Sequence, residues 1–279
     1  MPFFLIRGTY HIRGYSPDGD SIRFQAQTKA NWAKLGGQPV ALNARGHAQL
    51  RLEAIDTLET HYKNQHQPLD LAVKALDFLL KGLGITGMET DALWTMVTSV
   101  QDGTEGYILA RTTDKYQRPI AFVYAGEPPE KDGASIYLMP ERLRQSVNYG
   151  SLQAGLAYPT YYKGLFSNLR ETCTEVVRLA RSKGLGIWVQ DRTNSGFIYD
   201  GLKSITERNV ILPKLFRRLI EYFEGGGTSL AGFKKWLEAR DEAVFIISKG
   251  HFTHFDSLVE IKGKQITLLE PPENLIFIE

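Results

Sequence analysis

The segment Arg51-Leu-Glu-Ala-Ile-Asp-Thr-Leu-Glu-Thr60 constrains the fold of this chain more than any other. Its apolar residues fit a short strand anchored in a core, and charged side chains follow where that strand ends. Arg51, Asp56 and Glu59 are too costly to bury without partners. The segment therefore predicts either a solvated corner between strand and loop, or a site for a ligand that needs both charges. Such a ligand is a metal ion for the carboxylates and a phosphate for the arginine.

Two further segments join a polar turn to a β-prone run. In Pro17-Asp-Gly-Asp-Ser-Ile-Arg-Phe24, Asp20 follows an Asp-Gly turn at the start of a strand. In Thr112-Thr-Asp-Lys-Tyr-Gln-Arg-Pro-Ile-Ala-Phe-Val-Tyr124, Arg118 lies in the turn before a strongly β-prone run. Turns at strand ends are favoured positions for binding and catalytic residues, so both segments are candidates for a site.

In this order, the three segments resemble the motifs of the staphylococcal nuclease (thermonuclease) family. The family has an Asp-Gly-Asp-Thr turn, an Arg-x4-Asp-Thr-Pro-Glu-Thr strand end and a Thr-Asp-Lys-Tyr-Gly-Arg turn. The stretch from Gly155 to Trp188 is similar to its closing helices and terminal Leu-x-Ile-Trp. The resemblance covers about residues 1–191 and implies a five-stranded OB-type β-barrel with helices.

The resemblance implies a set of site residues, carried over position by position. They are the phosphate-contacting Arg51 and Arg118, the water-activating Glu59, the metal ligands Asp20, Asp56 and Thr57 (through its carbonyl), and the nucleotide contacts Lys115, Tyr116 and Tyr161.

Two positions depart from the family pattern. Leu58 stands where the family has proline, so the turn before Glu59 lacks a rigid φ angle. Gln117 stands where the family has glycine, which adopts positive φ without steric cost. Neither change removes a charged group, so both bear on the level of activity and on the shape of the site.

The implied chemistry suits these residue types. Calcium prefers oxygen ligands in flexible geometry and acts as a Lewis acid on a phosphoryl oxygen. Arginine forms bidentate, charge-assisted hydrogen bonds to phosphate oxygens, which lysine does not reproduce. The resemblance therefore predicts a calcium-dependent endonuclease that acts on DNA and RNA, cleaves the P–O5′ bond and leaves 3′-phosphates. The alternative is a catalytically weak or inactive nuclease-like module that binds nucleic acid or a protein partner.

Charge and cysteine content restrict the possible classes of function and fold. The net charge is only +2, and residues 1–192 carry 22 Lys and Arg against 19 Asp and Glu, so no global basic field predicts nucleic-acid binding. Phosphate affinity is instead expected to be local. The single cysteine, Cys173, excludes an intramolecular disulfide framework and is expected in the core.

The predicted fold class is α+β, with residues 1–192 as the nuclease-like barrel domain and residues 193–279 as a small α+β domain of unknown role. Polar residues 190–196 are expected to form a linker or a surface connection. Lys214, Arg217 and Arg218 are expected on a solvated helix face, and contact with phosphates is the alternative. Strands are expected near residues 3–15, 20–26, 38–43, 47–56, 92–100 and 118–124, and a helix over 69–81.

No apolar run in the chain is long enough to cross a membrane, and no signal peptide is recognisable. The expected location is therefore cytoplasmic, where free calcium is scarce, and another divalent metal is an alternative. The second domain is a candidate surface for a protein partner.

Overall fold

The computed structural model describes residues 2–91 and 96–278. The chain divides into two compact units, each built from two separate stretches of sequence. Unit 1 comprises Met1–Glu53 and Lys74–Ser151, and unit 2 comprises Ala54–Val73 and Leu152–Glu279. The predicted boundary at residue 192 followed the extent of the resemblance and stays a prediction. In the described part of the chain, no helix has both the length and the apolar character to span a bilayer.

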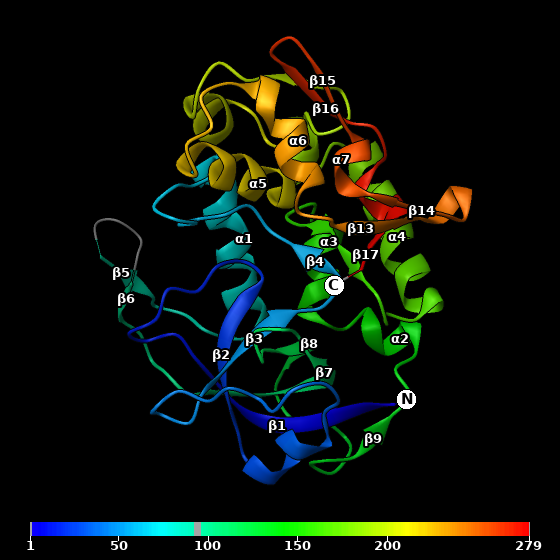
Figure 1. Ribbon diagram of the computed structural model, residues 1–279. Coiled ribbons are helices and arrows are strands. Elements are labelled where there is room, and N and C mark those ends of the chain that lie inside the picture. The colour runs from blue at the N-terminus through cyan, green and yellow to red at the C-terminus, as the bar shows by residue number, and fades with distance from the viewer. Residues whose placement is uncertain (1, 92–95, 279) are drawn as a thin grey trace. The chain divides into compact units, whose positions relative to one another are not determined.

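Unit 1 is built on a closed five-stranded β-barrel (Figure 1). The order β1-β2-β3-β8-β7 closes on itself because β1 pairs with both β2 and β7. The β3–β8 pair is parallel and the other barrel pairs are antiparallel. This confirms the expected barrel within an α+β fold, and the arrangement is consistent with the OB type. The strands are β1 (Phe3–His11), β2 (Ser21–Ala26), β3 (Ala48–Leu52), β7 (Thr104–Thr113) and β8 (Pro119–Ala125).

Strand alternation decides which side chains the barrel buries. Ile22 and Phe24 of β2, and Leu50 and Leu52 of β3, are buried to within 1% of full burial. The intervening residues of the same strands therefore face outward, and none of them is fully buried. These outward residues are Ser21, Arg23, Gln49 and Arg51.

One strand prediction was wrong, one strand was missed, and one prediction is tested only in part. β7, the longest strand, was not predicted, whereas residues 38–43 form no strand and only Leu42 makes an isolated bridge, to Ala48. Gly106 weakens the β pattern of β7, yet it is required there. A Cβ at this position would lie 2.5 Å from both the Tyr10 ring and a backbone oxygen of β8. The strand expected over 92–100 corresponds to β6 (Val97–Ser99), which pairs with β5 (Glu89–Thr90); residues 92–95 lie outside the described part.

The helix expected over 69–81 is α1 (Leu69–Gly82), and Leu71, Ala75 and Leu79 form its buried face. Three short elements complete the first part of the chain. They are β9 (Ser135–Ile136), which pairs with the start of β1, α2 (Pro140–Leu143) and α3 (Val147–Gln153).

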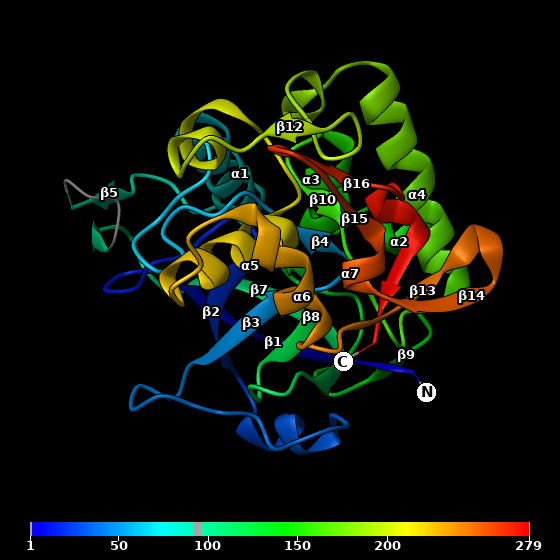
Figure 2. The ribbon, with the colours of Figure 1, turned by 45° about the horizontal axis from the view of Figure 1, so that its top comes forward.

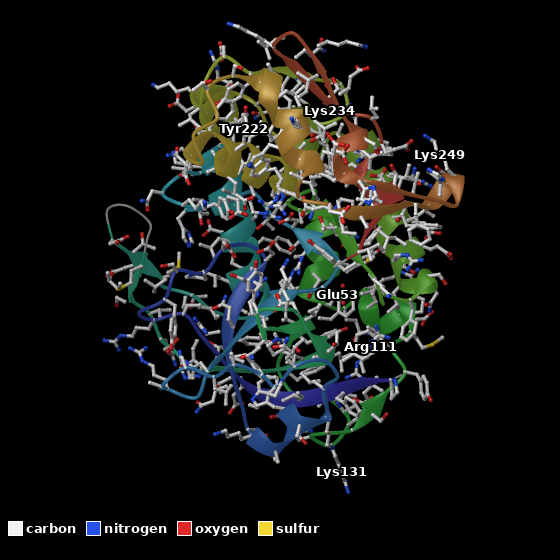
Figure 3. The ribbon with its side chains drawn as sticks, in the orientation of Figure 1. Glu53, Arg111, Lys131, Tyr222, Lys234 and Lys249 are labelled. Carbon is white, nitrogen blue, oxygen red and sulfur yellow. The ribbon has the colours of Figure 1, made fainter. Side chains whose placement is uncertain are left out.

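Unit 2 combines helices with three small sheets, of order β11-β17-β13-β14, β12-β16-β15 and β10-β4. Figure 2 shows the β13–β14 hairpin and the β15–β16 hairpin, and Figure 3 shows Tyr222 on α5 and Lys249 at the turn between β13 and β14. The helices are α4 (Ser167–Ser182), α5 (Pro213–Glu224), α6 (Phe233–Glu238) and α7 (Phe255–Leu258). The strands are β4 (Ile55–Asp56), β10 (Tyr158–Pro159), β11 (Tyr161–Tyr162), β12 (Phe197–Ile198), β13 (Ala243–Ile246), β14 (His251–His254), β15 (Val259–Lys262), β16 (Gln265–Leu268) and β17 (Leu275–Phe277).

The stretch 190–196 is not a free linker, contrary to expectation. Thr193 is fully buried, its hydroxyl accepts from the Leu212 N–H at 2.9 Å, and its carbonyl accepts from the Leu268 N–H at 2.9 Å. The Asp191 carboxylate accepts from the Tyr158 hydroxyl at 2.7 Å. These bonds join the stretch to both earlier and later parts of unit 2. Ending the chain after Asp191 would therefore remove part of a packed core.

Candidate functional site

The turn between β7 and β8 gathers two of the predicted phosphate contacts around one carboxylate. Asp114 accepts from the Arg118 guanidinium at 2.7 and 2.8 Å, and the Arg51 guanidinium lies 4.0 Å from the same oxygen. The other oxygen of Asp114 accepts from the backbone N–H groups of Tyr116 and Arg118, both at 2.9 Å. A buried carboxylate thus fixes the turn and holds two guanidinium groups at the outer wall of the barrel.

The tip of this turn is open to solvent. Lys115 is exposed, and the Tyr116 side chain is 65% exposed. The Tyr116 ring lies 5.4 Å from the Lys115 ammonium and 5.5 Å from the Arg118 guanidinium carbon. These two of the three predicted nucleotide contacts are therefore accessible to a ligand that approaches the two arginines.

Gln117 adopts a φ angle of +63°, the conformation that glycine tolerates best. We expect Gln117→Gly to stabilise the chain by about 0.5–1 kcal/mol, because a side chain in this region carries a steric cost. Urea denaturation measures the change. Lys115→Gly, at an exposed turn position without positive φ, is the matched control and should not stabilise. Equal effects of the two substitutions would contradict the steric explanation.

Asp20 lies at the start of β2, next to the end of β3. Its carbonyl accepts from the Leu52 N–H at 2.9 Å, and the neighbouring Ser21 is directly opposite Arg51 in the sheet. The Ser21 hydroxyl donates to Asp18 at 2.6 Å and thereby braces the turn that precedes Asp20. The backbone of unit 1 therefore brings Asp20 beside Arg51.

Asp56 and Glu59 belong to unit 2, where both bind one arginine of α5. The Arg217 guanidinium donates to the two oxygens of Asp56 at 2.9 and 2.8 Å, and to Glu59 at 2.5 Å. The Asp56 side chain is 7% exposed and that of Arg217 is 21% exposed. Burial lowers the pKa of Arg217, but the charges of Asp56 and Glu59 outweigh burial and raise this pKa well above its ordinary value.

The charged face of α5 is largely buried, although a solvated face was expected. Lys214 is 3% exposed, and both it and Arg218 form ion pairs with Glu242, at 3.2 and 2.5 Å. Glu221 accepts from Arg218 and from the Tyr62 hydroxyl, at 3.0 and 2.6 Å. The signal that was missed is the apolar content of α5, because its buried Leu215, Phe216, Leu219 and Ile220 leave little of the helix for solvent.

Glu242 makes the stability of unit 2 depend on pH. Burial raises its pKa, but hydrogen bonds from Arg218 and the charge of Lys214 outweigh burial and lower the pKa from 4.5 to about 2. A carboxylate with a depressed folded-state pKa stabilises the fold above its unfolded pKa. We therefore expect about 3 kcal/mol of stability at pH 7 to be lost as the pH falls from about 4.5 to about 2.

Urea denaturation across this pH range tests the role of Glu242. The stability difference between the native chain and Glu242→Gln should shrink as the pH falls through this window. Glu238→Gln, at an exposed position on α6, should show no such trend. A difference that stays constant down to pH 2 would exclude this linkage.

One of the predicted calcium ligands, Asp56, is paired with an arginine in this structure. Both oxygens of Asp56 are occupied by Arg217, and Asp20 belongs to the other unit. Within residues 2–91 and 96–278, no group of three or more His, Cys, Asp or Glu side chains is arranged to hold a metal ion. A calcium ion at Asp56 would compete with a guanidinium group for the same carboxylate.

Three remaining predicted positions are buried in unit 2. Thr57 is 3% exposed and Leu58 is 1% exposed, so packing anchors the turn in which the family has proline. Tyr161 is fully buried, and its hydroxyl bonds to the Thr174 hydroxyl at 2.9 Å. The ring of Tyr161 is therefore not available for contact with a base in this structure. Cys173 is buried on α4, as expected.

No protein-family model matches the chain, and no curated protein sequence matches it. The resemblance to the staphylococcal nuclease family therefore stays a prediction that rests on the short motifs and their order.

Proposed function

We propose that this chain is a nucleic-acid phosphodiesterase, an endonuclease that hydrolyses DNA and RNA at the P–O5′ bond and leaves 3′-phosphates. The observation that carries the proposal is the convergence of Arg51 and Arg118 on Asp114 at the barrel wall. Two planar guanidinium groups suit the non-bridging oxygens of a phosphodiester, on which negative charge builds up in the transition state. Lys115 and Tyr116, both exposed on the same turn, are the proposed contacts to the nucleotide.

Glu59 is the proposed base that orients or deprotonates water, and calcium is the proposed cofactor, with Asp20, Asp56 and the Thr57 carbonyl as ligands. When bound, calcium would supply Lewis-acid chemistry at a phosphoryl oxygen. The pairing of Arg217 with both carboxylates adds a condition to this proposal. Activity requires that Arg217 release Asp56 to the ion and Glu59 to the water.

A second candidate is a nuclease-like module that binds nucleic acid or a protein partner and does not cleave. The same Arg217 pairs favour it, because they neutralise the carboxylates that hydrolysis needs while leaving the Arg51 and Arg118 pair in place. The two candidates share phosphate binding at the barrel and differ in what happens to the bound strand.

Incubation with labelled single-stranded DNA and RNA separates the two candidates. The purified chain is tested with calcium, with manganese and with a chelator, and Glu59→Gln is compared with the exposed Glu238→Gln. The nuclease proposal expects metal-dependent cleavage with 3′-phosphate ends, which Glu59→Gln loses and Glu238→Gln keeps. Salt-sensitive binding of the strands without cleavage under any condition would support the binding module instead.

A further inference from the structure

The outer face of the barrel carries a cavity of about 310 Å³ beside β1, β2 and β3. We call it the Arg23 cavity. Its residues come from the strands and from the turn that joins β1 to β2. They are His11, Gly14, Tyr15, Ser16, Pro17, Ile22, Arg23 and Gln49.

Arg23 is the unusual member of this cavity. In the described part of the chain no carboxylate forms an ion pair with it, and its Nε is buried without a hydrogen-bond acceptor. The guanidinium carbon lies 5.2 Å from the Tyr15 ring, and burial lowers the pKa of Arg23. A partly buried cation without a counter-ion is a costly arrangement in a stable fold. An anionic ligand in the cavity would supply the missing charge.

The wall of the cavity is held rigidly by neighbouring side chains. The His11 ring bonds to Asp102 at 2.9 Å and to the Thr9 hydroxyl at 2.8 Å, and it stacks on His47 at 3.9 Å between ring centroids. The Tyr15 hydroxyl bonds to His47 at 3.0 Å. A fixed wall of this kind keeps its shape before a ligand arrives, which lowers the entropic cost of binding.

The charges around the cavity favour an anion. A second guanidinium, that of Arg45, lies 5.3 Å from the Tyr15 ring. Asp102, the carboxylate bonded to the cavity wall, is already engaged by His11 and by the Ile12 N–H. Residues 1–53 as a whole carry seven Lys and Arg against three Asp and Glu. This part of the barrel is therefore more basic than the chain average.

Strand register connects the Arg23 cavity to the Arg51 and Arg118 pair. Arg23 is directly opposite His11 on β1 and Gln49 on β3, while Arg51 is opposite Ser21. Arg23 and Arg51 are thus diagonal neighbours on the outward face of β2 and β3, a relation that places residues about 7–8 Å apart. This spacing is close to one nucleotide step of an extended strand.

We propose that the Arg23 cavity binds a second phosphate of the same nucleic-acid strand, next to the phosphate held by Arg51 and Arg118. This inference rests on the proposed function and sharpens its substrate class. The substrate is an extended single strand with at least two consecutive phosphodiesters lying along the outside of the barrel.

Fluorescence anisotropy with a labelled oligothymidylate of eight nucleotides, in chelator, tests the cavity without cleavage. We expect Arg23→Gln to lower affinity about tenfold and to reduce the slope of log affinity against log salt by about 0.7, the value for one phosphate contact on a single strand. Arg144→Gln, an exposed arginine at the end of α2, removes the same charge and should change neither quantity.

Thermal unfolding shows whether each variant is folded. Arg23→Gln should melt at or above the temperature of the native chain, because the substitution removes a cation without a counter-ion. Unchanged oligonucleotide affinity and salt slope in a folded Arg23→Gln would overturn the inference. Inorganic phosphate that competes fully with the oligonucleotide at the cavity would show a free-phosphate site and overturn it as well. A reduced slope of log affinity against log salt in Arg23→Gln would support phosphate binding in the cavity. If the native chain also cleaved no strand with any metal, the proposed nuclease activity alone would be rejected.

Discussion

Arg51→Lys is expected to lower the rate of phosphodiester cleavage by about a hundred- to a thousand-fold. Arg51 projects outward from β3 and lies 4.0 Å from Asp114, the carboxylate that also holds Arg118. Lysine keeps the positive charge but loses the planar fork that bonds two phosphate oxygens at once. Because the bidentate contact is most useful where charge builds up in the transition state, kcat should fall more than KM rises.

Steady-state cleavage of a labelled single-stranded oligonucleotide measures both constants. Arg144→Lys, an exchange of the same type at an exposed position, should leave them unchanged. If Arg51→Lys retained native kcat, the arginine pair would not be the phosphate site, and the observation that carries the proposed function would fail.

Arg217→Met is expected to destabilise the folded chain by about 3–5 kcal/mol, because it leaves two carboxylates without their shared cation in a largely buried site. The guanidinium makes three hydrogen bonds, two to Asp56 and one to Glu59, so both carboxylates depend on it. Urea denaturation near neutral pH measures the loss. Lys235→Met, an exposed position on α6, should shift stability by less than about 0.5 kcal/mol.

Removing all three charges separates two explanations of this loss. The triple substitution Asp56→Asn, Glu59→Gln and Arg217→Met should recover much of the stability, since uncompensated charge rather than lost packing is the expected cause. A triple variant as unstable as Arg217→Met alone would show that the arginine acts through packing.

Calcium gives a second readout of the same substitution. An ion that binds only the folded chain raises its melting temperature in proportion to its affinity. Calcium should therefore stabilise Arg217→Met more than it stabilises the native chain, where the guanidinium competes for Asp56. Equal calcium effects on both proteins would indicate that Asp56 is not a ligand.

Local patterns predicted those parts of the structure that depend on neighbouring residues. The helix over 69–81 and the strand over 20–26 follow from periodicities of 3.6 and 2 residues, and both are observed as α1 and β2. Closure of the barrel depends instead on β7 pairing with β1, about a hundred residues earlier. No periodicity within β7 encodes that partner, and Gly106 made the strand harder to detect.

The candidate site divides in the same way. The turn at Asp114 could be predicted from the sequence because its carboxylate, its exposed tip and Arg118 lie within five consecutive residues. The role of Arg217 could not be predicted, because the sequence of a basic helix face is the same whether it contacts water or buried carboxylates. Those carboxylates lie 158 and 161 positions earlier in the chain. Only tertiary packing decides between these environments.

Unit 2 is built from two stretches of sequence, and this sets the order in which its parts are synthesised. Asp56 and Glu59 leave the ribosome long before α5 exists, since 161 residues separate Asp56 from Arg217. At roughly 5–20 residues per second, that interval lasts about 8–30 s. Residues 54–73 also wait for the partners of Tyr62 and Gln67, which are Glu221 and Ile211. During synthesis, Asp56 and Glu59 are therefore present without Arg217. Chaperones or cations in the cell can reach these two carboxylates before the arginine does.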